Sequence, residues 1–220
     1  MSQELGKIDK ANTEDYKNKR KLFMVPIIFT PFEPNQDAEI LITKYWNQVK
    51  NQINSLTQSL GIVKHIFHET LSVGGHEGLE QLKNMNSKTY SFVQEQWESG
   101  AEIHVTEDLV SLTEMIDLQR IANIPFSSEG VRSKIESWYS EVAEKRFSAI
   151  RESIDSKIKS DEIGLLLMSE NHNIEFPEDI EVIHVSPPAL HDFRRWLDDF
   201  IQEQMKMYSQ AEENTNEEEN

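Results

Sequence analysis

The stretch Ile163-Gly164-Leu165-Leu166-Leu167-Met168 is apolar at every position. A strand with one face in water alternates apolar with polar residues, whereas a strand covered on both faces is a continuous apolar run. The segment therefore predicts a strand that is buried on both faces of a sheet.

Four further short, largely apolar runs alternate with helix-like stretches; they are residues 24–29, 62–68, 101–105 and 181–185. Strands that alternate with helices are typical of a parallel sheet with helices packed on its faces. Pro26 cannot donate a hydrogen bond to a neighbouring strand, so we expect its strand to lie at an edge or to begin late. The sequence predicts an α/β fold, with a mostly parallel sheet of about five strands and helices on its faces, in a single domain.

Apolar residues spaced by three and four predict the helices between these strands. The first helix is expected to end at Gly61, and one interrupted helix or two should follow and stop at Gly100. Thr106 is expected to cap the next helix. A long helix is expected from about residue 129 to 159, and a last one from 188 to about 208.

The chain has 22 basic and 39 acidic residues, a formal net charge of −17 and no cysteine. Lysine and arginine supply most of the affinity for phosphates and anionic lipids, so this charge argues against nucleic-acid and membrane partners. The lack of cysteine excludes disulfides, iron–sulfur clusters and Cys-ligated zinc. No apolar run has the length of a membrane span or a signal peptide, and we expect a cytoplasmic location.

Three regions are expected: a polar N-terminal extension at residues 1–21, the α/β domain at 22–208 and an acidic tail at 209–220. The last ten residues contain five glutamates and no cation. Because such a segment repels itself and offers little to bury, we expect the tail to be disordered.

Polar side chains that could carry chemistry follow three of the predicted strands. They are His68 and Glu69, then Glu107 and Asp108, and finally His172. The carboxyl ends of parallel strands lie along one edge of a sheet, where such folds bind ligands. Imidazole and carboxylate groups suit Zn²⁺, Mn²⁺ or Fe²⁺ when cysteine is absent, so these five residues form the predicted divalent-metal site. The same groups could instead act without a metal as general acid and base.

Several of these residues, and His65 beside them, also have a purely structural interpretation. Glu107 and Asp108 lie in a predicted first helical turn, where acidic side chains interact favourably with the helix dipole. His68 and Glu69 point to opposite sides of an extended strand, and both reach one site only if the strand has ended at His68. His65 alternates with apolar residues, so it is either a ligand or a hydrogen-bonded histidine of the core or surface.

Arg146 interrupts an apolar stripe on the long predicted helix, in which Trp138, Val142, Ile150 and Ile154 recur in steps of four. An arginine at that position either extends past the apolar surface into water or pairs with a buried acid or anion. Charged side chains are rarely buried without a partner, which favours the first interpretation.

Residues 72–78, Ser-Val-Gly-Gly-His-Glu-Gly, connect a predicted strand with a predicted helix. That is the context of a phosphate-binding loop. The segment has neither a dinucleotide-binding nor a Walker pattern, it contains no lysine, and Glu77 would place a negative charge near a phosphate. A flexible turn is the favoured interpretation.

The order of elements, together with His68-Glu69, Arg146 and the segment IGLLLMSENH that ends at His172, resembles the TraB/PrgY-like, Tiki-type and erythromycin-esterase-like group. The resemblance implies an α/β fold and a metal-assisted hydrolase, and it assigns Glu69 and His172 as site residues with Arg146 as support. The chain lacks the group's glycine-rich stretch with histidine after the first strand and the glycine-rich turn before the late histidine. A fainter similarity, over residues 140–185, is to the C-terminal domain of archaeal and eukaryotic release factors.

Two functions of different classes follow. The first is a metal-assisted hydrolase of a small-molecule or peptide substrate, with His68, Glu69, His172 and Arg146 as catalytic residues. In this enzyme a metal would polarise a carbonyl or activate water while a carboxylate moves the proton. The second is a non-enzymatic interaction or regulatory protein that forms a homodimer through a helical interface and meets a basic partner through its acidic surface and tail.

Overall fold

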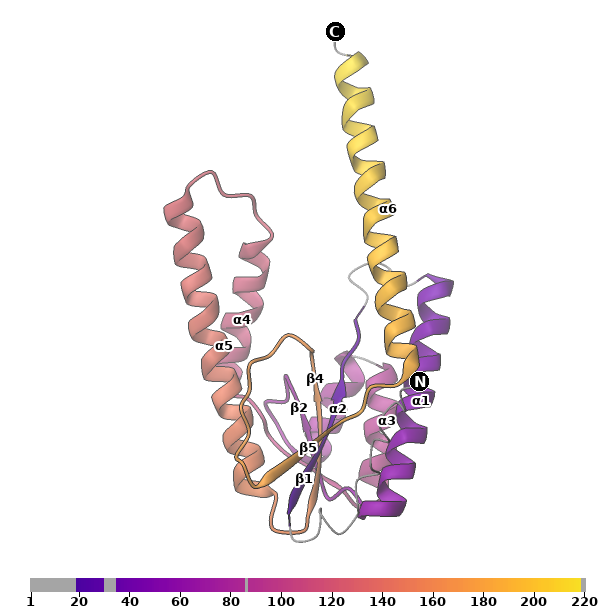
Figure 1. Cartoon of the computed structure of the whole chain (residues 1–220). Helices are drawn as coiled ribbons and strands as arrows, with labels where there is room; N and C mark the ends of the chain where they lie inside the picture. The colour runs from indigo at the N-terminus through magenta and orange to yellow at the C-terminus, as the bar shows by residue number, and fades with distance from the viewer. Residues whose placement is uncertain (1–18, 30–34, 86, 219–220) are drawn as a thin grey trace, which may run out of the picture.

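One parallel sheet, with helices on both faces, forms the centre of the molecule (Figure 1). The computed structural model describes residues 19–29, 35–85 and 87–218, so most of the predicted extension at 1–21 lies outside the described residues. The strands follow the order β3-β2-β4-β1-β5 across the sheet. Their bounds are Arg20–Pro26 (β1), His65–His68 (β2), Glu102–Ile103 (β3), Ile163–Met168 (β4) and Ile180–His184 (β5). The predicted α/β class, with a parallel five-stranded sheet in a single domain, is confirmed.

The helices are Gln36–Leu60 (α1), Gly75–Met85 (α2), Ser87–Glu98 (α3), Leu109–Ala122 (α4), Glu129–Lys157 (α5) and Pro188–Glu218 (α6). The stretch for which one or two helices are expected thus forms two, α2 and α3. α6 continues well beyond residue 208, through most of the acidic segment for which the sequence predicts disorder. Within the described residues, no helix combines the length and the apolar character needed to cross a membrane.

β4 is buried at every position, as its apolar sequence predicts. Leu165 and Leu167 belong to the core beneath α1, α3 and the start of α6. Leu166 and Met168 belong to a second core beneath α5. Successive side chains of a strand point to opposite faces, so helices on both faces require an apolar residue at every position of β4.

β1 is not an edge strand, and the expectation based on Pro26 is wrong. β1 pairs with β4 on one side and with β5 on the other. Pro26 is its last residue, where a missing donor costs least. The strand also begins earlier than expected, at Arg20 and Lys21. These cations are tolerated because Lys21 Nζ lies 3.0 Å from Asp161 and Arg20 Nη2 lies 2.7 Å from Asp179.

α4 is capped by Asp108, not by Thr106 as the sequence predicts. The Asp108 carboxylate accepts a hydrogen bond from the backbone N–H of Ser111 at 2.9 Å. Thr106 is buried and donates its hydroxyl to the carbonyls of His68 and Leu71. It therefore joins the ends of β2 and β3 instead of starting a helix.

α4 and α5 form a hairpin that extends past the carboxyl ends of the strands, as α6 does on the other side of the molecule (Figure 1). Within the hairpin, Met115 and Leu118 of α4 pack against Val142 of α5. Nearer its C-terminus, α5 packs Ile150 and Ile154 on the sheet. The apolar stripe of α5 therefore packs against α4 in its first part and against the sheet in its second part. Arg146 lies between these two contacts.

Candidate functional site

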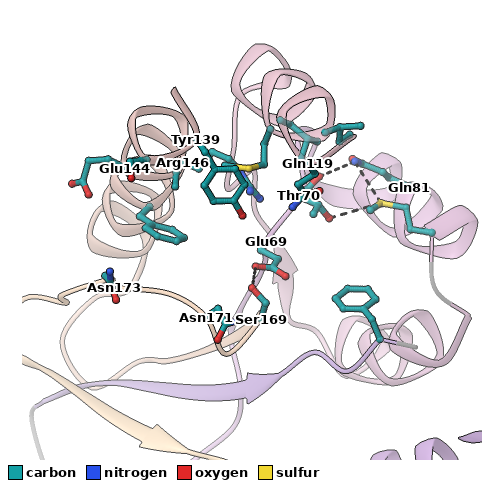
Figure 2. Close-up of a pocket in the computed structure, with 18 of the residues that line it drawn as sticks. Glu69, Thr70, Gln81, Gln119, Tyr139, Glu144, Arg146, Ser169, Asn171 and Asn173 are labelled. Atoms are coloured by element: carbon teal, nitrogen blue, oxygen red, sulfur yellow. Dashed lines mark hydrogen bonds between the residues drawn. The ribbon is translucent and has the colours of Figure 1, made fainter. Parts of the chain in front are cut away.

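A pocket with a volume of about 1090 Å³ lies at the carboxyl ends of β2 and β4, the edge of the sheet at which the sequence predicts a site. Residues that follow these two strands form one part of it, and side chains of α2, α4 and α5 form most of the rest (Figure 2). Phe29, three residues after β1, also lines the pocket. The polar lining consists of Glu69, Thr70, Gln81, Asn84, Gln119, Tyr139, Ser140, Glu144, Arg146, Ser169, Asn171 and Asn173.

Glu69 is a nearly buried carboxyl on this lining, 8% exposed. Its backbone N–H donates to the carbonyl of Leu167 at 2.9 Å, which continues the β2–β4 pairing by one residue. Ser169, directly after β4, donates its hydroxyl to Glu69 Oε2 at 2.8 Å (Figure 2). Burial raises the pKa of Glu69, against the opposing effects of the Ser169 hydrogen bonds and the positive charge of Arg146.

Glu107 and Arg146 form an ion pair beside Glu69. The Glu107 side chain is fully buried and that of Arg146 is 12% exposed. Both guanidinium nitrogens that face Glu107 donate to it, and Nη2 lies 2.7 Å from Oε1. Arg146 therefore pairs with a buried acid, and the favoured expectation that it extends into water is wrong. The dipole interpretation of Glu107 also fails, because its carboxylate binds Arg146 instead of the helix start.

Thr70 has a backbone conformation that L-residues seldom adopt, with a φ of 94°. For a β-branched residue this is a strained conformation, and such strain concentrates at functional sites. The neighbours hold it in place: the Thr70 N–H donates to Glu107 Oε1 at 2.9 Å and its carbonyl accepts from Gln81 Nε2 at 2.9 Å. The strained residue thus links Glu69 to the Arg146–Glu107 pair.

His68 points away from the pocket. β2 runs through His68, which pairs with Leu167, so its side chain faces the α1 side of the sheet. The ring is buried, Nδ1 donates to the carbonyl of Glu69, and Nε2 has no hydrogen-bond partner among the residues that the structure describes. Burial lowers the pKa of His68 to about 4, although the hydrogen bond to the Glu69 carbonyl opposes the shift.

His172 and Asp108 do not line the pocket either. His172 lies in the loop after β4, where its Nδ1 is 3.4 Å from the backbone N–H of Ile174. Its pKa is lowered by partial burial and by the nearby His184. Asp108 is exposed and caps α4. Of the residues predicted for the site, the structure brings together Glu69, Glu107 and Arg146, and it directs His68, His172 and Asp108 elsewhere.

The donor groups at the pocket do not suit the metal that the sequence predicts there. Glu69 accepts from Ser169, Glu107 is saturated by Arg146 and Thr70, and the imidazoles of His68 and His172 do not line the pocket. A divalent transition-metal site needs several convergent imidazole or carboxylate ligands. Among the described residues, such a group occurs instead at the β2–β3 edge, outside this pocket.

The glycine-rich segment at residues 72–78 serves packing. A Cβ on Gly78 would lie 2.7 Å from the carbonyl oxygen of Val73, and one on Gly74 would lie 3.0 Å from that of Ile103. The glycines thus allow the start of α2 to lie close against the preceding loop and β3. Together with Glu77 in the first turn of α2, this agrees with the favoured interpretation as a turn.

Ser169, Tyr139 and Asn171 line the pocket without having been predicted from the sequence. The sequence does carry a signal for Ser169, because it is the first polar residue after the apolar run of β4. Glu69 holds the same position after β2, so both are expected at the same edge of the sheet. Tyr139 lies on the same helix as Arg146, about two turns earlier. Whether Tyr139 reaches the pocket depends on the orientation of the α4–α5 hairpin relative to the sheet. The periodicity of side chains along a helix does not determine that orientation.

Neither a family model, nor a curated protein, nor a solved structure matches the chain, so the interpretation of this pocket rests on its geometry and chemistry.

Proposed function

We propose that the pocket is the active site of a hydrolase that acts on a small molecule, with Glu69 as the general acid–base group. The proposal rests on the Glu69 carboxyl, which lines the pocket at a strand's carboxyl end and whose pKa burial raises. A carboxyl group with a raised pKa both accepts and returns a proton more readily near neutral pH. Parallel α/β folds bind ligands at this edge of the sheet.

The lining favours a substrate with an apolar body and a carbonyl group, such as an ester or amide. Phe29, Met115 and Phe147 offer apolar contact, while Asn171 and Asn173 offer amide donors. In hydrolysis, Glu69 would take a proton from a water molecule while the oxygen of that water attacks the carbonyl carbon. The same proton would then pass to the leaving oxygen or nitrogen as its bond to carbon breaks.

Arg146 and Ser169 would act by positioning Glu69. Ser169 fixes one carboxyl oxygen through its hydroxyl, and Arg146 places a positive charge near the carboxylate form. The divalent metal predicted from the sequence is not used here, because the ligands do not converge on the pocket. The resemblance to the TraB/PrgY-like, Tiki-type and erythromycin-esterase-like group implies Glu69 and His172 as site residues with Arg146 as support; Glu69 and Arg146 line this pocket, and His172 does not.

Chromogenic esters and amides of graded size provide the test, with the wild type compared with Glu69→Gln. We expect Glu69→Gln to lower kcat/KM about 10²- to 10⁴-fold, the usual contribution of a general acid–base group. Glu144→Gln is the matched control, since Glu144 is an exposed carboxylate on the same lining, and it should retain activity. Hydrolysis that is equal in wild type and Glu69→Gln, or absent from both across the series, would refute the hydrolase.

A second candidate function, of a different class, is self-association through the α4–α5 hairpin. Its large apolar side chains are exposed to an unusual degree: Leu109, Val110, Ile116, Ile121, Ile124, Val131 and Trp138 are each at least one-third exposed. Exposed apolar side chains that gather on one element mark interaction sites. Two antiparallel helices can meet the same face of a second copy around a two-fold axis, so the proposed occupant is a second copy of this chain.

Light scattering coupled to size-exclusion chromatography tests the homodimer. Trp138 is 56% exposed, and Trp138→Glu should convert a dimer to a monomer because it places a charge in the apolar contact. Ile62→Glu changes a residue that is 67% exposed and lies far from the hairpin, and it should leave the dimer intact. A wild type that is monomeric at high concentration, or a dimer that tolerates Trp138→Glu, would contradict the proposal.

A further inference from the structure

Three metal-ligating side chains meet at the β2–β3 edge of the sheet, away from the pocket. Potential ligand atoms of His65, Glu102 and His104 all lie within 4.8 Å of one another. The strand register explains the meeting: His65 of β2 pairs with Glu102 of β3, and residues two apart on a strand share a face, so His104 joins them. The ring of His104 stacks on Phe67, a residue of the core beneath α5, which places the cluster on the α5 side of the sheet.

The two imidazoles already face one another. His65 Nδ1 and His104 Nε2 are 2.9 Å apart, slightly closer than two nitrogens bound to one tetrahedral zinc ion. A small outward movement of either ring would admit the ion between them. The His104 side chain is nearly buried, 6% exposed, so the surrounding side chains hold its ring in place beside His65.

A fourth residue orients the His65 ring. Glu162 Oε2 lies 2.9 Å from His65 Nε2, and Glu162 is itself held by Lys64 Nζ at 3.1 Å and by the backbone N–H of Lys159 at 3.0 Å. With the Nε2 proton donated to Glu162, Nδ1 carries a lone pair and accepts a hydrogen bond from His104 Nε2. A metal ion between the rings would take the place of that shared proton. Metal-binding histidines commonly donate their second ring N–H to a carboxylate in this way, which fixes the tautomer.

The cluster is open to solvent on one side. The side chain of Glu102 is 72% exposed and its Oε1 lies 3.9 Å from His104 Nδ1, so it can move toward an arriving ion. The histidines supply two fixed ligands and Glu102 an adjustable one, which leaves one position of a tetrahedral ion for water. Two imidazoles and one carboxylate are a ligand set that favours Zn²⁺ over Mg²⁺ or Ca²⁺.

We propose that His65, Glu102 and His104 bind a divalent transition metal of the Zn²⁺ class at the β2–β3 edge. The ion ties the short edge strand β3 to β2 and, through Glu162, to the turn that precedes β4. The site is separate from the proposed active site, whose lining includes none of these residues.

The test uses the full chain without a histidine tag, stripped with a chelator and titrated with Zn²⁺ alone by calorimetry and thermal unfolding. We expect one equivalent to bind with a Kd of about 1 μM or tighter and to raise the Tm, because an ion that binds only the folded state stabilises it. Glu102→Gln should weaken binding about 10- to 100-fold while leaving the Tm of the metal-free protein unchanged, since the side chain is exposed.

Glu181→Gln is the matched control, because Glu181 is a glutamate of β5, the strand at the opposite edge of the sheet. It should bind Zn²⁺ as the wild type does, and so should His172→Asn and the pocket variant Glu69→Gln. Absence of saturable binding, or equal binding by Glu102→Gln and Glu181→Gln, would overturn the proposal. Loss of binding in Glu69→Gln would also overturn it, because it would place the ion in the pocket.

Discussion

At the scale of single residues, Thr70 combines a strained backbone with hydrogen bonds to both Glu107 and Gln81. Strain of this kind persists only where the surroundings over-determine the conformation. Its position next to Glu69 means that the direction of the Glu69 side chain depends on the same bonds. Substitutions at Thr70 therefore measure how much the strained backbone of this residue costs in stability.

We predict that Thr70→Gly is more stable than Thr70→Ala by about 1–2 kcal/mol, because glycine adopts a φ of 94° without the clash that a Cβ causes. Chemical denaturation of both variants measures the difference. Thr43, on the exposed side of α1, serves as the control. There the order should reverse, with glycine the less stable by roughly 0.5–1 kcal/mol, and the same order at both positions would count against strain at Thr70.

His68 should make the protein sensitive to acid. Its folded-state pKa of about 4 lies below the ordinary 6.5, so the unfolded chain takes up a proton first as the pH falls. The free energy of unfolding is therefore unaffected by His68 above pH 6.5. It falls progressively between pH 6.5 and 4, by roughly 3 kcal/mol in total. His68→Asn should lack this loss in pH-dependent denaturation, whereas His191→Asn, exposed on α6, should follow the wild type.

At the scale of secondary-structure elements, the contact between β4 and the end of α5 depends on Gly164. A Cβ there would overlap Ile158 Cδ1 and come within 3.1 Å of Leu22 Cδ1 and 3.2 Å of Phe67 Cε2. Gly164 thus lets the end of α5 come close to the strand, and these neighbours belong to the core beneath α5.

We predict that Gly164→Ala lowers the free energy of unfolding by about 1–3 kcal/mol, the usual effect of overpacking a core. Gly130→Ala, in the first turn of α5, is the control, because its Cβ would have room with Ser128 Oγ at 3.8 Å. That variant should be neutral or stabilised by up to about 1 kcal/mol, as alanine favours helix. If Gly164→Ala were equally harmless, the packing of α5 on β4 would be looser than described.

The elements that the sequence predicts best are those whose signal is local. The apolar run of β4 and the helix ending at Gly61 depend on neighbours along the chain, and both are confirmed. The sequence predicts too late a start for β1 because its first residues, Arg20 and Lys21, resemble surface residues. Their acidic partners are Asp179 and Asp161, far along the chain, so only the folded structure shows that these cations can begin a central strand.

For the candidate site, too, the sequence predicts the features that have a local signal and misses those that depend on distant parts of the chain. Glu69 was identified because it directly follows a strand, and strand ends can be read from the sequence. Side-chain parity then separates it from His68, once β2 is known to run through His68. The cluster of His65, Glu102 and His104 was missed as a set because it depends on the register between β2 and β3. Register between strands from different parts of the chain has no local signature.

At the scale of the whole molecule, the net charge of −17 sets the response to salt. Excess like charge repels itself in the compact state, and added ions screen that repulsion. Several of the ion pairs within the described residues lie on the surface, where each contributes little, as for Lys44–Asp192 and Lys145–Glu141. Repulsion should therefore outweigh them.

We predict that the Tm rises as NaCl is added at pH 7, and that the rise shrinks near the isoelectric point, where carboxylates are partly protonated and repulsion is weaker. Differential scanning calorimetry at several salt concentrations and two pH values measures both effects. A Tm that falls with salt at pH 7 would show that attractive ion pairs dominate the electrostatics of the fold.

The position of β1 in the sheet also bears on how the chain folds during synthesis. Among the described strands β1 is synthesised first, yet both of its partners, β4 and β5, lie more than 130 residues later in the sequence. Pairings between distant segments form slowly, because a long loop must close before they contribute. A nascent chain that ends before Ile163 can pair β2 with β3 and form its early helices, but β1 must wait, unpaired, until β4 has been made.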